Sequence, residues 1–102
     1  MDSIEITILK NLIHNDEYSR KVLPFINKEY FEEFHEKIIF EEICTFIVKY
    51  STLPTKETLT IESEKRTDIT EDVFSKIRDC VGLLDDTPND HQWLLDTTEK
   101  WC

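Results

Sequence analysis

Hydrophobic residues recur along most of this chain every three or four positions, which predicts helices rather than strands. The first predicted helix covers residues 3–14, although residues 4–8 alternate like a strand and are rich in β-branched side chains. The residues that follow favour a helix, because the apolar residues of the whole segment then fall on one helical face: Ile4, Ile8, Leu9, Leu12 and Ile13. Asn15 can cap a second short helix, which Pro24 prevents from continuing. Asn27 can cap a further single turn.

The most apolar segment, residues 35–50, predicts a helix that other helices surround. Its hydrophobic side chains form two stripes and leave only a narrow polar strip: Ile39, Ile43, Phe46, Ile47 and Tyr50 in one stripe, and Phe40, Cys44 and Val48 in the other. A helix that is apolar over so much of its circumference lies in a core. We therefore expect this helix at the centre of the fold.

Three more helices are expected in the second half of the chain. Residues 56–65 form a weak one with two apolar positions, and Thr70 caps a stronger one that extends to residue 84. Gly82 should weaken that helix unless a close neighbour needs the space. After a break at residues 85–88, Asn89 or Asp90 caps a last helix that runs to Cys102.

These elements predict an all-α fold, a compact bundle of about six helices around the central apolar helix. The residues expected in its core are apolar and lie on the inward stripes of the predicted helices: Leu12, Phe31, Ile39, Phe40, Ile43, Ile47, Ile77 and Val81.

The last predicted helix carries two tryptophans on one face. Trp93, Leu94, Thr97, Thr98 and Trp101 lie on that face. One interpretation is that the aromatic residues fold back onto the core of the domain. The other is that they pack against a neighbouring subunit, because aromatic residues are enriched at such interfaces. We predict four of these residues as a candidate subunit or partner interface: Trp93, Leu94, Thr97 and Trp101.

Composition limits the possible functions. The 102 residues suffice for one domain, and 22 acidic against 12 basic residues give a formal net charge of −10. Such a surface repels phosphate, so direct nucleic-acid binding is disfavoured. No apolar run approaches the ~20 residues that span a membrane. Cys44 and Cys80 are expected as buried thiols in a reducing cytoplasm, and Cys102 as an exposed thiol.

No motif in the sequence predicts catalysis or a cofactor. A glycine-rich phosphate loop is excluded because Gly82 is the single glycine. Glu32 and His35 have the spacing of a ligand pair in di-metal helical bundles, but no second pair occurs. We therefore expect no catalytic residue, no bound cofactor and no metal, and we expect His35 to cap or pack.

Short sequence motifs occur along the chain in an order that resembles the order in a known family. The motifs are Ile8-Leu9, Leu12-Ile13, Asn15-Asp16-Glu17, Val22-Leu23-Pro24, Tyr30-Phe31, His35 before Ile38-Ile39-Phe40, Leu53-Pro54 and Thr58-Leu59. This order resembles the N-terminal domain of DnaB-like replicative helicases, which is all helical and lacks the ATPase. Residues 88–94, with Thr98-Glu99-Lys100 behind them, are similar to the corresponding segment of T-even-type bacteriophage helicases, which are primase-helicase subunits.

The resemblance implies a structural role. Residues 1–88 would be the globular head, and residues 89–102 would begin a helical-hairpin arm that is truncated here. The domain would form the collar of a hexameric helicase in the bacterial host cytoplasm and contact its own subunits and primase during DNA replication. ATP, Mg²⁺ and 5′-to-3′ DNA translocation would belong to an ATPase domain outside these residues, so this chain would not be an enzyme by itself. We expect a monomer or weak dimer, because the hairpin is incomplete.

A second hypothesis is a complete small acidic phage protein that mimics DNA or inhibits a host nucleic-acid-binding protein. Its support is the charge of −10 and the short length. Binding of such a mimic to a basic partner should depend steeply on salt. The helicase hypothesis instead predicts that alanine at Trp93 and Trp101 abolishes association with little change in salt sensitivity.

Overall fold

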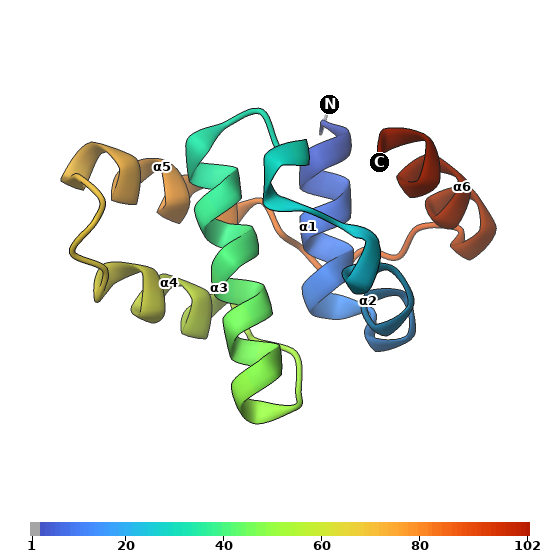
Figure 1. Ribbon diagram of the computed structural model, residues 1–102, viewed down its shortest axis with the longest axis horizontal. Coiled ribbons are helices and arrows are strands. Elements are labelled where there is room, and N and C mark those ends of the chain that lie inside the picture. Colours follow the sequence, from blue (N-terminus) through green and yellow to red (C-terminus); the bar gives the residue numbers. More distant parts are fainter. Residues whose placement is uncertain (1–2) are drawn as a thin grey trace.

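The computed structural model describes residues 3–102, and in that range every regular element is a helix (Figure 1). Six α-helices follow one another: α1 (Ile4–His14), α2 (Asp16–Val22), α3 (Phe34–Tyr50), α4 (Lys56–Glu64), α5 (Glu71–Gly82) and α6 (His91–Trp101). Two short 3-10 turns, η1 (Leu23–Phe25) and η2 (Lys28–Tyr30), lie between α2 and α3. The prediction of an all-α fold with about six helices is confirmed. The first two residues of the predicted head, 1–88, lie outside the described residues.

Side-chain caps explain where most of these helices begin. The side-chain oxygen of each cap accepts a hydrogen bond from a backbone N–H two or three residues further on, as is usual at helix N-termini. These caps are Ser3, Asn15, Asn27, Thr55, Thr70 and Asp90. At α3, Glu33 and Glu36 form a reciprocal capping box. His35 therefore does not cap α3 but lies in its first turn, half-buried, where burial lowers the pKa of its imidazole.

Helix α3 lies in the middle of the molecule, with α4 and α5 on one side and α1, α2 and α6 on the other (Figure 1). Most of the residues expected in the core are buried: Leu12, Phe31, Ile39, Phe40, Ile43, Ile77 and Val81. Ile47 is partly buried and packs against the edge of this core. The phenyl rings of Phe31 and Phe40 lie 5.3 Å apart, so the turn before α3 is packed onto the helix itself.

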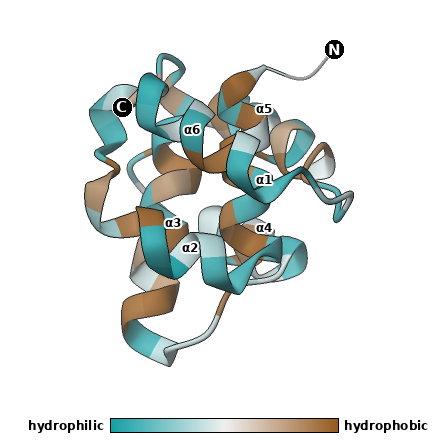
Figure 2. Cartoon of the chain, turned by 90° about the vertical axis from the view of Figure 1, so that its right-hand side faces the viewer, coloured by the Kyte–Doolittle hydropathy of each residue, from teal (hydrophilic) through white to brown (hydrophobic). Residues whose placement is uncertain are grey.

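The C-terminal part of α3 differs from the expectation of a fully surrounded helix. Val48 is 83% exposed and Tyr50 is 51% exposed. Hydrophobic positions, brown in Figure 2, therefore continue to the lower end of α3. Helices α1, α4 and α5 pack against α3, and Ile39 and Ile43 are fully buried there. The last residues of α3 are covered on only part of their surface, so their side chains remain exposed.

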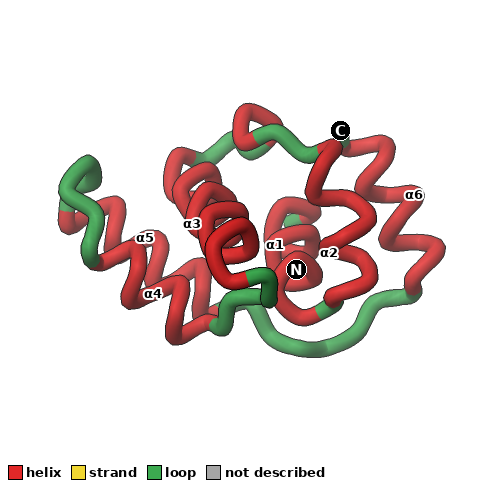
Figure 3. The backbone as a smooth tube through the Cα atoms, turned by 60° about the horizontal axis from the view of Figure 1, so that its bottom comes forward, coloured by secondary structure: helices red, strands yellow, loops and turns green. Residues whose placement is uncertain are grey.

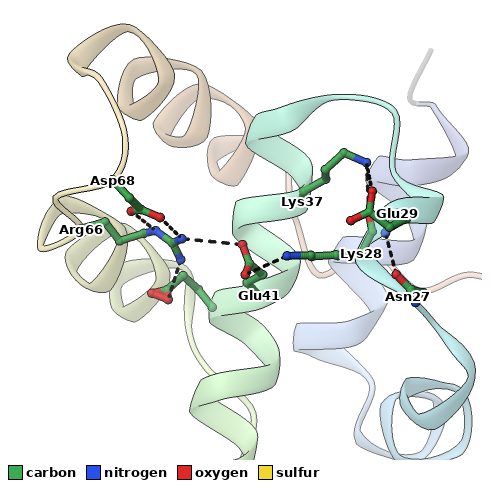
Figure 4. Close-up of polar contacts among 8 residues, drawn as sticks. Asn27, Lys28, Glu29, Lys37, Glu41, Arg66 and Asp68 are labelled. Carbon is green, nitrogen blue, oxygen red and sulfur yellow. Dashed lines mark hydrogen bonds and ion pairs between the residues drawn. The ribbon is translucent and has the colours of Figure 1, made fainter.

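An ionic network fastens the loops on both sides of α3 (Figure 4). Glu41 lies 3.6 Å from Lys28 of η2 and 3.7 Å from Arg66, which follows α4. Arg66 also lies 3.7 Å from Glu42 and donates two hydrogen bonds to Asp68, which lower the pKa of that carboxyl. Part of the acidic surface is thus engaged within the chain and is not available to a basic partner.

Gly82 offers a test of stability at the end of α5. No heavy atom lies within 4 Å of the place where a Cβ would stand, and the residue does not adopt a left-handed conformation. No neighbour needs the space, so Gly82→Ala should raise the free energy of unfolding by about 0.5–1 kcal/mol, because alanine restricts the unfolded chain. Urea unfolding followed by circular dichroism measures this change. An unchanged or lower stability would contradict it.

A candidate partner-binding groove between α2 and α6

Helix α6 packs against α2, and Figure 3 shows the two helices side by side. The contact face of α6 is formed by Leu94, which is fully buried, and by Thr98 one turn later. The Thr98 hydroxyl oxygen lies 2.6 Å from the hydroxyl oxygen of Tyr18 on α2 and donates to the backbone carbonyl of Leu94. Both hydroxyl groups are therefore satisfied inside the body.

The end of α6 is held by Trp101. Its indole N–H donates to the carboxylate of Glu5 on α1 over 3.2 Å. Its ring packs edge-on against Phe31 at 4.8 Å and Tyr30 at 5.8 Å between centroids. At the other end, the Asn11 amide donates to Asn89 over 3.0 Å. Both ends of α6 are therefore fastened to the rest of the domain.

The four predicted interface residues have different surroundings. Leu94 is inside the body, so its side chain does not reach the surface. Thr97 and Trp101 are half-buried, and Trp93 is 49% exposed. Among these four, Trp93 offers a large exposed apolar side chain to a partner. An interface role for this set, and an arm beginning at residue 89, stay predictions.

The adjacent face of α6 lines a groove that sequence reasoning missed. Leu95, Glu99 and Cys102 follow one another at positions i, i+4 and i+7 on one wall, and α2 with η1 forms the other. The groove has a volume of about 620 Å³. It is lined by Gln92, Leu95, Asp96, Thr98 and Glu99 of α6, by Cys102 directly after that helix, and by Lys21, Val22 and Phe25 from the opposite wall. Phe25 is 73% exposed, and its place after Val22-Leu23-Pro24 was the one sequence signal for the groove.

The rim of the groove is charged unevenly. Asp96 and Glu99 lie on the α6 wall, whereas Lys21 lies on the α2 wall. Asp96 accepts a hydrogen bond from the Gln92 amide over 2.9 Å. Within residues 3–102 no basic side chain forms an ion pair with Asp96 or Glu99. The groove therefore combines an apolar interior with a border that is acidic on the α6 wall and carries Lys21 on the α2 wall.

The other candidate groups within residues 3–102 are the Glu32–His35 pair and the thiols of Cys44 and Cys80. Within the described range, no group of three or more His, Cys, Asp or Glu side chains could hold a metal ion, so Glu32 and His35 form no such centre there. Burial raises the pKa of the Cys44 thiol to about 11 and that of Cys80 to about 12. Such thiols stay protonated, whereas a nucleophilic cysteine needs a lowered pKa.

None of the helices in residues 3–102 is long and apolar enough to cross a membrane.

The buried phenol of Tyr18, beneath the groove, should make the free energy of unfolding depend on pH in the alkaline range. Burial raises its pKa from 10.0 to about 12, so the folded state holds the phenolic proton more tightly than the unfolded state. This stabilisation is complete below pH 10 and is lost as pH rises towards 12. Tyr18→Phe removes the titrating group, so the variant should lose less stability over that interval than the parent.

Urea unfolding at pH values across this interval measures the effect. Tyr30→Phe is the control, because it makes the same chemical change at a tyrosine that is 42% exposed. The buried cysteines titrate in both variants and cancel in the comparison. If the free energy of unfolding falls equally with pH in the parent and in Tyr18→Phe, the prediction is contradicted.

Comparison with known proteins finds similarity to a viral helicase. The chain is 34% identical over 94 residues to a DnaB-like replicative helicase of Enterobacteria phage T4. The match covers 92% of this chain and 20% of that helicase, so the chain spans about a fifth of the relative's length. No family model matches the chain. The similarity confirms the resemblance inferred from the sequence motifs, and its extent is consistent with a fragment like the N-terminal domain.

Proposed function

We propose that this chain is the N-terminal collar and interaction domain of a phage replicative DNA helicase. The observation that carries this proposal is 34% identity across 92% of the chain to a phage helicase of which it spans one fifth. Such a domain would support assembly of the hexamer and contact primase during DNA replication in the host cytoplasm. ATP and Mg²⁺ would bind to an ATPase domain of the full-length protein, and this chain would act without catalysis.

The surface of the domain supports a role in protein contact. Trp93, Phe25 and the C-terminal part of α3 expose large hydrophobic side chains, and such groups favour association with other proteins. The net charge of −10 disfavours contact with DNA phosphates. A role that combines apolar contacts with rejection of nucleic acid fits a collar better than a DNA-binding element.

Calorimetric titration of this chain into the primase of the phage that encodes it tests the proposal. We expect saturable binding with a negative heat-capacity change and a shallow dependence on salt, because the exposed groups are apolar. Light scattering on the chain alone should show a monomer or weak dimer. Absence of binding to primase, together with absence of self-association when the chain is joined to the rest of its helicase, would contradict the proposal.

The net charge of −10 favours one other candidate, an acidic inhibitor of a host nucleic-acid-binding protein. That function predicts binding to basic host proteins that falls steeply as salt is raised. Titrations at low and high salt distinguish the two functions, because the collar function predicts that binding to primase changes little as the salt concentration is raised.

A further inference from the structure

We propose that the groove between α2–η1 and α6 binds an amphipathic helix of a partner protein whose apolar stripe is bordered by lysine or arginine. This inference rests on the proposed function as a protein-contact domain and specifies the partner's chemistry. The occupant is another protein rather than a second copy of this chain.

The interior of the groove favours apolar side chains. Phe25 stands 73% exposed on one wall, and Leu95 is half-buried on the other. Between them, Val22 and Thr98 are buried, and the Thr98 hydroxyl is already bonded to Tyr18 and the Leu94 carbonyl. An entering side chain therefore meets no unsatisfied polar group there. The volume of about 620 Å³ lies within the range of roughly 300–1,000 Å³ typical of ligand pockets.

The walls favour a helical occupant. The α6 wall presents Leu95 and Glu99 one helical turn apart, with Cys102 directly after the helix, and α2 with η1 lies beside it. A furrow between two adjacent helices accepts a third helix, whose side-chain ridges fit between those of the walls. Helix-in-groove recognition uses apolar anchors at i, i+3 or i+4, and i+7. Phe25 and Leu95 offer contacts for such a row of anchors.

The charge on the rim selects a basic partner. Asp96 and Glu99 border the α6 wall, form no ion pair with a basic side chain among the described residues, and outnumber Lys21 on the opposite wall. A lysine or arginine on the bound helix would supply the missing charge and favour one orientation. A second copy of this chain would bring the same acids and a further net charge of −10, so self-association through this groove is disfavoured.

The probe is a labelled peptide of about 18 residues, long enough to form a helix, with a leucine stripe bordered by lysines. Fluorescence anisotropy measures its binding to the chain. A matched peptide carries glutamate in place of each lysine. We expect the lysine peptide to bind and the glutamate peptide to bind at least about tenfold more weakly, because its charges face Asp96 and Glu99.

Two variants locate the site. Leu95→Glu makes the chain more negative, so non-specific attraction to the lysine peptide would increase, whereas occupation of the groove predicts binding at least about tenfold weaker. The double variant Asp96→Lys and Glu99→Lys should bind the glutamate peptide more tightly than the lysine peptide. Val48→Glu, an equal change at the far end of α3, is the control and should leave binding unchanged.

Each remaining outcome overturns the inference. Binding that Leu95→Glu strengthens would mean general attraction to an acidic protein. Binding that Val48→Glu weakens as much as Leu95→Glu does would mean that the peptide is not held in the groove. No binding of either peptide would remove the groove as a helix site. A dimer in light scattering that Leu95→Glu dissociates would identify a second copy as the occupant. Circular dichroism verifies that each variant is folded. Primase binding measured on the same samples is independent, so the proposed function can hold while this inference fails.

Discussion

Replacing Leu94 with alanine is expected to lower the free energy of unfolding by about 2–5 kcal/mol, the usual range for a buried leucine. Leu94 is fully buried between α6 and the body, and one turn later Thr98 is bonded to Tyr18. The truncation leaves a cavity where α6 meets α2. A loss of this size is a large part of the stability of a small domain.

Leu95→Ala is a matched control, since it removes the same atoms from the next residue of the same helix. Leu95 is half-buried and faces the groove, so its replacement should cost much less than that of Leu94. Urea unfolding followed by circular dichroism measures both losses. Similar small losses at the two positions would mean that α6 is not packed against this domain in solution, as a projecting arm would be.

The existence of α6 could be predicted from the sequence, but its orientation could not. Asp90 provides a cap, and no glycine or proline interrupts residues 91–102. Apolar residues occupy more than one side of the helix, so periodicity alone left open which side faces inward. The contact that decides this joins Tyr18 to Thr98, which are 80 positions apart. Spacing within a helix contains no information about such a partner.

The same limit explains the end of α3. Its hydrophobic stripes continue to Tyr50, and the sequence predicts burial wherever the stripes continue. Burial also requires a neighbouring element, and Val48 has none that covers it. The apolar residues of α3 could therefore be identified correctly, whereas the extent of their burial depends on where α1, α4 and α5 pack.

The groove could not be predicted because neither wall has a distinctive pattern. Leu95 is the single large apolar side chain on its face of α6, between Gln92 and Glu99. Phe25 belongs to a short hydrophobic run that ordinarily indicates a core segment. Only the packing of α2 against α6 brings these two positions together. The two acids of the α6 wall, Asp96 and Glu99, likewise belong to no sequence pattern that indicates a binding surface.

Phe31→Ala is expected to lower the free energy of unfolding by about 3–5 kcal/mol. Phe31 is fully buried, and its ring lies 5.3 Å from that of Phe40 on α3 and 4.8 Å from that of Trp101 on α6. The substitution therefore removes contacts with two helices that are far apart in the sequence. We expect both the global stability and the environment of Trp101 to change.

Phe34→Ala is the control, because Phe34 is 52% exposed and should cost far less. Both variants are made in a Trp93→Phe background, in which Trp101 is the single tryptophan. Fluorescence should shift to longer wavelength in Phe31→Ala before any denaturant is added, since the indole loses an apolar neighbour and gains water. A large loss of stability with unchanged emission would mean that Phe31 supports α3 alone. An unchanged stability would contradict its place in the core. Together with the Leu94 series, this experiment separates two supports of α6, one at its centre through α2 and one at its end through the aromatic cluster.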